Sequence, residues 1–177
     1  ATGSLPSSLP LEVQTTWALL TTVTWTNRQA QGTLLGTLQL GPGLNPYVAH
    51  LSQMWAAWGG SMQVRLMVSG SGMYAGRLMA AIIPPGINPA GVTNPGQFPH
   101  TLIDARETEP VLLNIPDIRP TAYHQEGERI ETVSIGLWVF NPLINPFNGN
   151  PAVVSSAYVT VETRPGPDFD FAMLKPP

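Results

Sequence analysis

The 177-residue chain has no cysteine and little charge, and each absence removes a class of function. Without cysteine there is no disulfide, no thiolate metal site and no thiol nucleophile. No run of about 18 apolar residues is present, so no membrane-spanning helix is predicted. The eight Lys and Arg residues are scattered and the formal net charge is −3, so no basic strip for nucleic-acid phosphates is predicted either.

Charged residues make up only 11% of the chain. An average soluble domain has about 25%, and a monomer keeps its surface hydrated mostly with charge. The low value therefore favours a surface that is covered largely by neighbouring protein subunits.

Proline is abundant, with 19 residues, and its placement indicates a β-protein. Each proline inside a helix costs about 3 kcal/mol, so a mainly helical fold is excluded. Between the prolines, β-branched and aromatic residues that alternate with a period of two predict strands bounded by turn residues. We expect eight strands, at residues 17–25, 33–40, 62–69, 76–83, 101–105, 111–115, 131–140 and 155–163.

One clear helix is predicted between the second and third strands. Asn45 can cap it, Pro46 suits its first turn, and apolar residues recur at helical spacing from Tyr47 to Trp58, before Gly59 and Gly60 end it. Eight antiparallel strands with one or two short helices in connecting loops predict an all-β fold, an eight-stranded jelly-roll sandwich.

Residues 70–75 (GSGMYA) match a dinucleotide-binding fingerprint and follow a predicted strand. That fingerprint needs a helix behind the glycines to receive the pyrophosphate. Residues 77–83 are instead strand-like and run into two prolines, so we predict a strand connection and no nucleotide site.

Three histidines, His50, His100 and His124, are the only candidates for a metal site of the cupin type. They show no short ligand spacing, so structural roles are favoured, with a cupin-like metalloenzyme left as an alternative. No catalytic set emerges, and we predict no enzyme, no cofactor and no metal.

Acidic residues gather in two places, and each group contains an arginine. Asp104, Glu107 and Glu109 lie near Arg106, and three glutamates at 126, 128 and 131 lie near Arg129. Ion pairs at a surface or a subunit interface are favoured over acid–base catalysis. The predicted subunit-interface residues are Asp104, Arg106, Glu107, Glu109, Asp117, Arg119 and Arg129.

Several short segments follow one another in an order that carries a family resemblance. They are Leu40-Gly-Pro, Leu44-Asn-Pro-Tyr-Val-Ala-His-Leu-Ser52, Trp58-Gly-Gly60, Ser69-Gly-Ser-Gly72, Ala75-Gly-Arg77, Ile83-Pro-Pro-Gly86, Phe98-Pro-His100, Leu102-Ile-Asp-Ala-Arg106, Pro116-Asp-Ile-Arg119, Glu162-Thr-Arg-Pro-Gly-Pro-Asp-Phe-Asp-Phe171 and Pro176-Pro177. Each segment by itself is weak evidence of a family. With all of them in this order, the chain resembles the shell domain of the calicivirus major capsid protein. The resemblance implies a remnant of an N-terminal arm at 1–16, the shell domain at 17–171 and the start of a hinge at 172–177.

The resemblance also implies the function. We expect a structural, non-enzymatic protein that self-assembles as a homo-oligomer into a closed icosahedral layer around an RNA genome. The expected location is the virion, and the host cytoplasm during assembly. No specific RNA site, no membrane contact and no glycan site are expected on this chain, because family members recognise glycans mainly on a protruding domain. A jelly-roll carbohydrate-binding module is the alternative function.

Overall fold

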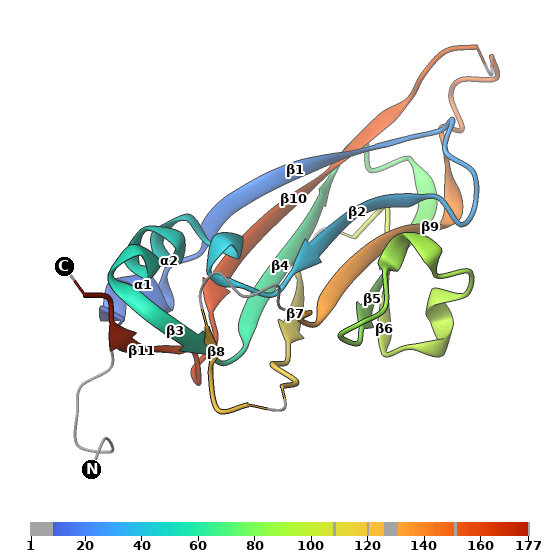
Figure 1. The fold of residues 1–177 in the computed structure, drawn as a ribbon. Helices are drawn as coiled ribbons and strands as arrows, with labels where there is room; N and C mark the ends of the chain where they lie inside the picture. The colour runs from blue at the N-terminus through green and yellow to red at the C-terminus, as the bar shows by residue number, and fades with distance from the viewer. Residues whose placement is uncertain (1–8, 108, 120, 126–130, 151, 177) are drawn as a thin grey trace.

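Two four-stranded antiparallel sheets face each other in the computed structural model, which describes residues 9–107, 109–119, 121–125, 131–150 and 152–176 (Figure 1). The first sheet has the order β1-β10-β4-β7, with β1 (Ala18–Thr26), β10 (Ser156–Pro165), β4 (Met62–Ser69) and β7 (Val111–Ile115). The second has the order β2-β9-β5-β6, with β2 (Leu34–Gln39), β9 (Ser134–Ile144), β5 (Ala75–Ile83) and β6 (His100–Asp104). Apart from β5 and β6, which pair with each other, consecutive strands of these eight lie in opposite sheets, as in a jelly roll.

The eight predicted strands correspond to these eight, and the all-β jelly-roll prediction is confirmed. The described part of the chain holds three further strands that the sequence did not predict. They form a small sheet of order β11-β3-β8, with β11 (Asp170–Leu174), β3 (Trp55–Gly59) and β8 (His124–Gln125). β11 continues past residue 171, where the sequence placed the end of the shell domain.

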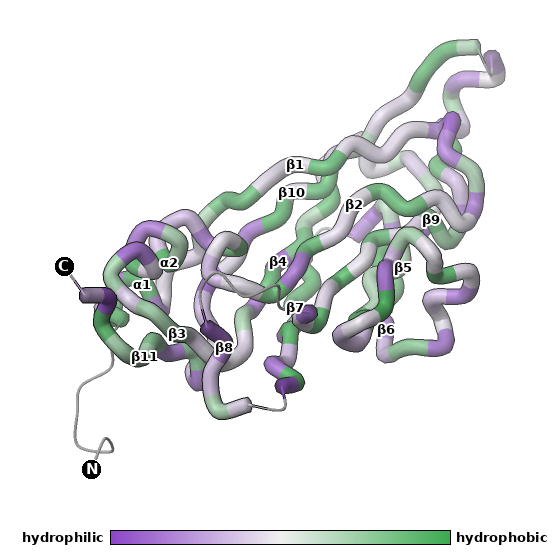
Figure 2. Tube along the Cα trace, viewed as in Figure 1, coloured by the Kyte–Doolittle hydropathy of each residue, from purple (hydrophilic) through white to green (hydrophobic). Residues whose placement is uncertain are grey.

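The core lies between the two large sheets, where the inward residues of facing strands meet. Val64, Leu66, Val159 and Val161 of the first sheet are buried, as is Ile135 of the second. The period of two follows from the pleat, which sends alternate side chains to one face. Figure 2 shows apolar segments along these strands.

The outer face of the second sheet is covered as well, which explains why β9 is buried on both faces. The connection between β5 and β6 holds two 3-10 turns, η4 (Pro89–Gly91) and η5 (Pro95–Gln97). Its Val92 and Phe98 pack against Ala81, Ile83 and Trp138 on that face.

The predicted helix begins as expected and ends earlier than expected. The side-chain oxygen of Asn45 accepts from the backbone N–H groups of Tyr47 (2.9 Å) and Val48 (3.2 Å), which confirms the cap. The helix α2 (Pro46–Leu51) then tightens into η3 (Ser52–Met54), and residues 55–59 form β3.

The prediction of helix at Trp55 and Trp58 is therefore wrong. Both residues have partners that lie far along the chain, since Trp55 pairs with Leu174 and Trp58 pairs with Phe171 of β11. Pairing and aromatic packing thus override a local spacing that fits a helix. The remaining short helices are α1 (Leu11–Thr15) and η2 (Pro42–Leu44). In the ranges that the structure describes, no helix is long and apolar enough to cross a membrane.

Gly59 and Gly60, predicted to end a helix, instead end β3 and turn the chain into β4. Gly60 has φ 107°, a left-handed conformation that a side chain opposes. A Cβ there would overlap the carbonyl oxygen of Asp168 and lie 2.5 Å from Phe169 Cα. Only glycine therefore lets the segment before β11 approach this turn.

We predict that Gly60→Ala lowers the free energy of unfolding by at least about 3 kcal/mol, because strain in φ adds to a backbone clash. Urea unfolding followed by tryptophan fluorescence measures the loss. The matched control is Gly72→Ala, because Gly72 has no atom within 4 Å of an added Cβ and should change stability by less than about 0.5 kcal/mol. Equal effects of the two substitutions would contradict the role given to Gly60.

Candidate functional site

Four connections meet at one end of the sandwich, which we call the loop end (Figure 1). They join β1 to β2, β4 to β5, β6 to β7 and β9 to β10. Hydrogen bonds tie them to one another: Asn27 Nδ2 donates to the carbonyl oxygen of Val153 (3.1 Å), and Arg106 Nε donates to that of Tyr74 (3.1 Å). The opposite end carries α1, α2 and the small sheet.

The connection between β9 and β10 extends farthest from the sandwich and is built from successive Asx turns (Figure 1). The side-chain oxygen of Asn145 accepts from the N–H of Phe147 (3.0 Å), that of Asn148 from Asn150 (3.1 Å), and that of Asn150 from Ala152 (3.0 Å). These bonds shape the backbone around Phe147 without a packed core beneath it.

Apolar side chains are exposed at the loop end, which is unusual for a surface in water. Phe147 is 76% exposed, the largest fraction among the exposed large apolar residues in the described chain. The others at this end are Met73, Ile144, Val153 and Val154. Figure 2 shows apolar residues on the extended β9–β10 connection.

The first group of predicted interface residues lies beside these apolar residues. Asp104 accepts from the backbone N–H of Arg106 (2.9 Å) and faces Arg77, with 3.8 Å between Arg77 Nε and Asp104 Oδ2. Glu107 and Glu109 are exposed next to them. An open cavity of about 470 Å³ is lined by Arg77, Asp104 and Arg106 together with Ile144 and its neighbours. The loop end thus combines an apolar centre with charged margins.

The second group of predicted interface residues lies in a different place. The side chain of Asp117 is only 3% exposed, and it links the small sheet to the residues beside it. Its carboxylate accepts from the N–H of Gly60 (2.8 Å), from Arg119 and from His124 Nε2 (2.7 Å). Asp117 and Arg119 therefore bind each other within the subunit, and their place in a subunit interface stays a prediction. Arg129 lies outside the described residues.

Aromatic rings pack beside Asp117 and its partners, and together they form one cluster around the small sheet. The Trp58 ring stacks on His124, with 4.3 Å between centroids, and on Phe169, with 5.8 Å. Phe171 packs edge-on against Phe169 and stacks on Trp55. The three strands of the small sheet are thus joined by their side chains as well as by backbone pairing.

Asp168 is tied to the same cluster through Ser61, whose backbone N–H (3.1 Å) and hydroxyl both donate to its carboxylate. Partial burial by itself raises the pKa of Asp168. The hydrogen bonds from Ser61 and from its own backbone N–H, together with the positive charge of Arg119, outweigh burial and lower the pKa below its usual value.

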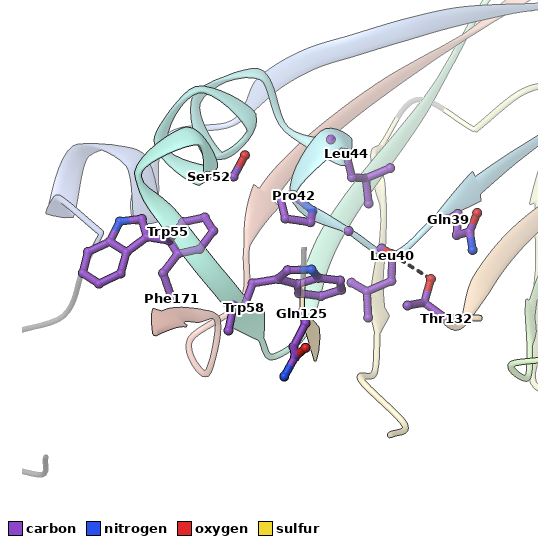
Figure 3. A pocket seen from close by; sticks show the side chains of 13 residues that line it. Gln39, Leu40, Pro42, Leu44, Ser52, Trp55, Trp58, Gln125, Thr132 and Phe171 are labelled. Carbon is purple, nitrogen blue, oxygen red and sulfur yellow. Dashed lines mark hydrogen bonds between the residues drawn. The ribbon is translucent and has the colours of Figure 1, made fainter. Parts of the chain in front are cut away.

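A pocket of about 450 Å³ opens beside the small sheet (Figure 3). Trp55, Trp58 and Phe171 line one side, and Leu40 and Pro42 lie on another. Trp58 stacks on both His124 and Phe169, and Trp55 stacks on Phe171, so these rings already contact one another within the subunit.

The three histidines do not gather into one site. His50 is exposed on α2, His100 Nδ1 lies 2.8 Å from the carbonyl oxygen of Phe98, and His124 is buried against Asp117. The described residues contain no group of three or more His, Cys, Asp or Glu residues that could hold a metal ion. Residues 70–74 connect β4 to β5, and a strand follows them as predicted.

The apolar residues of the loop end, Phe147 above all, were not among the site residues predicted from the sequence. The signal was present: an aromatic residue stands in an Asn-Pro-Phe-Asn-Gly-Asn-Pro stretch between two strands. Such a stretch cannot continue either strand, so its aromatic side chain has no core to enter.

A family model described as the calicivirus coat protein matches residues 1–177. The capsid protein VP1 of feline calicivirus (strain CFI/68 FIV) is 46% identical over 177 residues, which cover 100% of this chain and 26% of the relative. The subgenomic capsid protein VP60 of rabbit calicivirus is 48% identical over 154 residues, 87% of this chain and 26% of the relative. The chain therefore spans about a quarter of the length of these curated relatives.

Solved structures show the same architecture. A human norovirus GI.7 virus-like particle, described in T=3 symmetry, has a chain with a TM-score of 0.83 and 30% identity, covering 100% of this chain and 36% of that one. The empty capsid of Triatoma virus matches with a TM-score of 0.78 and 19% identity over 93% of this chain and 94% of that one, which shows the fold alone. These proteins lend no support to the carbohydrate-binding alternative.

We predict that Asp117→Asn lowers the free energy of unfolding by about 3 kcal/mol, because it leaves Arg119 and His124 without a buried anionic acceptor. Urea unfolding at neutral pH measures the change. The control is Asp104→Asn at the half-exposed pair with Arg77, where a loss of less than about 1 kcal/mol is expected. A loss at Asp117 no larger than at Asp104 would show that the buried carboxylate does not hold the small sheet.

We also predict that Asp168 makes stability depend on acid pH. Its pKa is lower in the folded than in the unfolded chain, so its stabilisation is complete above about pH 4 and is lost as pH falls through the folded value. Urea midpoints measured from pH 6 to pH 3 should fall less steeply for Asp168→Asn than for the unaltered chain. Ser61→Ala should flatten the same part of the curve, and unchanged slopes in both variants would refute the assignment.

Proposed function

This chain belongs to the calicivirus coat protein family, and we propose that it is the shell domain, a structural part that assembles with further copies of itself into a closed icosahedral capsid layer. The observation that carries the proposal is the match of the family model to residues 1–177. The role is non-enzymatic: the chain supplies surfaces and a rigid frame.

The composition of the surface supports this function. A subunit in a closed layer contacts neighbours on several sides, so less of its surface needs charge to stay hydrated. The 11% charged residues and the exposed apolar side chains of the loop end both fit a surface that other copies cover. An isolated monomer would leave Phe147 and its apolar neighbours in water.

We propose that the loop end is one of the contacts between copies. Its exposed apolar residues are flanked by Asp104, Arg106 and Glu107, which matches the apolar centre and polar rim of protein interfaces. The Asx turns around Phe147 hold the backbone in place before contact. A loop that is already ordered loses less conformational entropy on docking.

The remaining partners follow from the same proposal. The layer encloses an RNA genome without a specific RNA site on this chain, which agrees with the scattered Lys and Arg residues and the net charge of −3. We propose no glycan site and no membrane contact here. The chain resides in the virion, and in the host cytoplasm while particles assemble.

We predict that Phe147→Asp raises the protein concentration needed for particle formation at least about tenfold. Leaving one such side chain exposed instead of burying it costs about 1.5–3 kcal/mol. Each 1.4 kcal/mol changes an association constant about tenfold. Light scattering and electron microscopy over a concentration series measure the threshold.

The matched control is Phe147→Leu, which keeps an apolar side chain at the same place and should assemble near the original threshold. Thermal unfolding of both variants should match the unaltered chain, since Phe147 contributes little to the core. If Phe147→Asp assembles normally, the loop end is not a contact that limits assembly. If the unaltered chain stays monomeric at every concentration and salt condition, the shell function itself fails.

A further inference from the structure

A third cavity lies inside the sandwich, away from the loop end and from the small sheet. It has a volume of about 230 Å³ and lies between the two large sheets, at the edge where β1 and β2 face each other without pairing. β1, β4 and β10 of the first sheet line it, as do β2 and β9 of the second. It is therefore a gap in the core at one open edge of the sandwich.

The lining changes in character from the base of the cavity to its mouth. Leu66, Ile135, Leu137 and Val161 are buried, each 5% exposed or less. Val23 and Leu38 are half-buried, whereas Thr21 and Thr37 are exposed. No charged residue is among the described residues that line it. The cavity thus has an apolar base and a neutral, polar mouth.

The pairing of the strands is irregular near the mouth of the cavity. The register of β1 against β10 shifts between Leu19 and Thr21, and that of β2 against β9 shifts between Leu34 and Gly36. Such bulges bend an edge strand and increase its twist. Gly36 adds to the opening, because a glycine places no side chain between β2 and Val23.

We propose that this cavity binds a small neutral amphiphile: an unbranched aliphatic chain in the apolar base, with a hydroxyl head at the threonine-flanked mouth. An apolar cavity of about 150 Å³ in an engineered protein excludes water and binds benzene. Benzene has six carbon atoms, so at the same volume per carbon atom a cavity of 230 Å³ accommodates roughly nine carbon atoms. A charged head group is disfavoured, since the lining offers no opposite charge.

This inference does not rest on self-assembly, so it is tested on the dispersed chain with 1-octanol as the probe. At ten times its dissociation constant, octanol should raise the melting temperature by about 3–6 °C. In methyl NMR spectra it should shift the signals of Leu66, Ile135, Leu137 and Val161. The signals of exposed Leu112 and Val153 should stay unchanged.

The blocking variant is Gly36→Leu. A Cβ on Gly36 would lie 3.8 Å from Val23 Cγ2, an ordinary contact, and the φ of Gly36 is not in the left-handed region. The added leucine should occupy the cavity, raise the melting temperature by itself and abolish the octanol-dependent rise. Thr24→Val, on the exposed outer face of β1, is the matched control and should bind octanol as the unaltered chain does.

If Gly36→Leu does not fold, Gly36→Ala decides, because its single methyl group still takes up cavity space and should weaken octanol binding. Three results would overturn the proposal. One is the absence of shifts at the four buried methyl residues, and another is shifts of equal size at Leu112 and Val153. The third is octanol binding that the folded Gly36 variants leave unchanged.

Discussion

Apolar side chains of β4 and β10 pack against those of β9 between the two large sheets, and this contact determines the rest of the structure. A sheet that buries one face against another can carry its connections only at its two ends. Neighbouring strands run antiparallel, so the connections fall at both ends: four of them meet at the loop end, and the others leave from the opposite end. The loop end and the end with the small sheet are therefore consequences of how the core is closed.

The two ends serve different physical needs. At one end, polar and aromatic contacts fasten the small sheet inside the subunit: Asp117 accepts from three separate partners, and Trp58 stacks on two rings. At the other, side-chain oxygens of asparagine shape a loop whose apolar residue points away from any core. The loop end also leaves apolar side chains exposed, above all Phe147, which another molecule can cover.

Most of the sandwich could be predicted because its signals are local. The strands around Val64 and Val159 alternate with a period of two, and turn residues such as Gly70 after the first of them mark where a strand stops. The small sheet could not be predicted in this way. β8 has only two residues, and β3 is defined by its pairing with β11, which comes at the far end of the chain. Trp55 and Trp58 fit a helix as well as a strand when their neighbours in space are unknown.

The sequence by itself determined the class of protein: low charge and the spacing of the prolines indicated a β-sandwich with covered surfaces, and an ordered set of short segments carried the resemblance to a shell domain. Only the tertiary structure decided which charged and apolar residues share a surface. Asp104 and Asp117 look alike in the sequence, yet one lies at an open end and the other is buried under three hydrogen bonds. The reason is that exposure depends on which distant strands pack over a residue, and local sequence does not encode that.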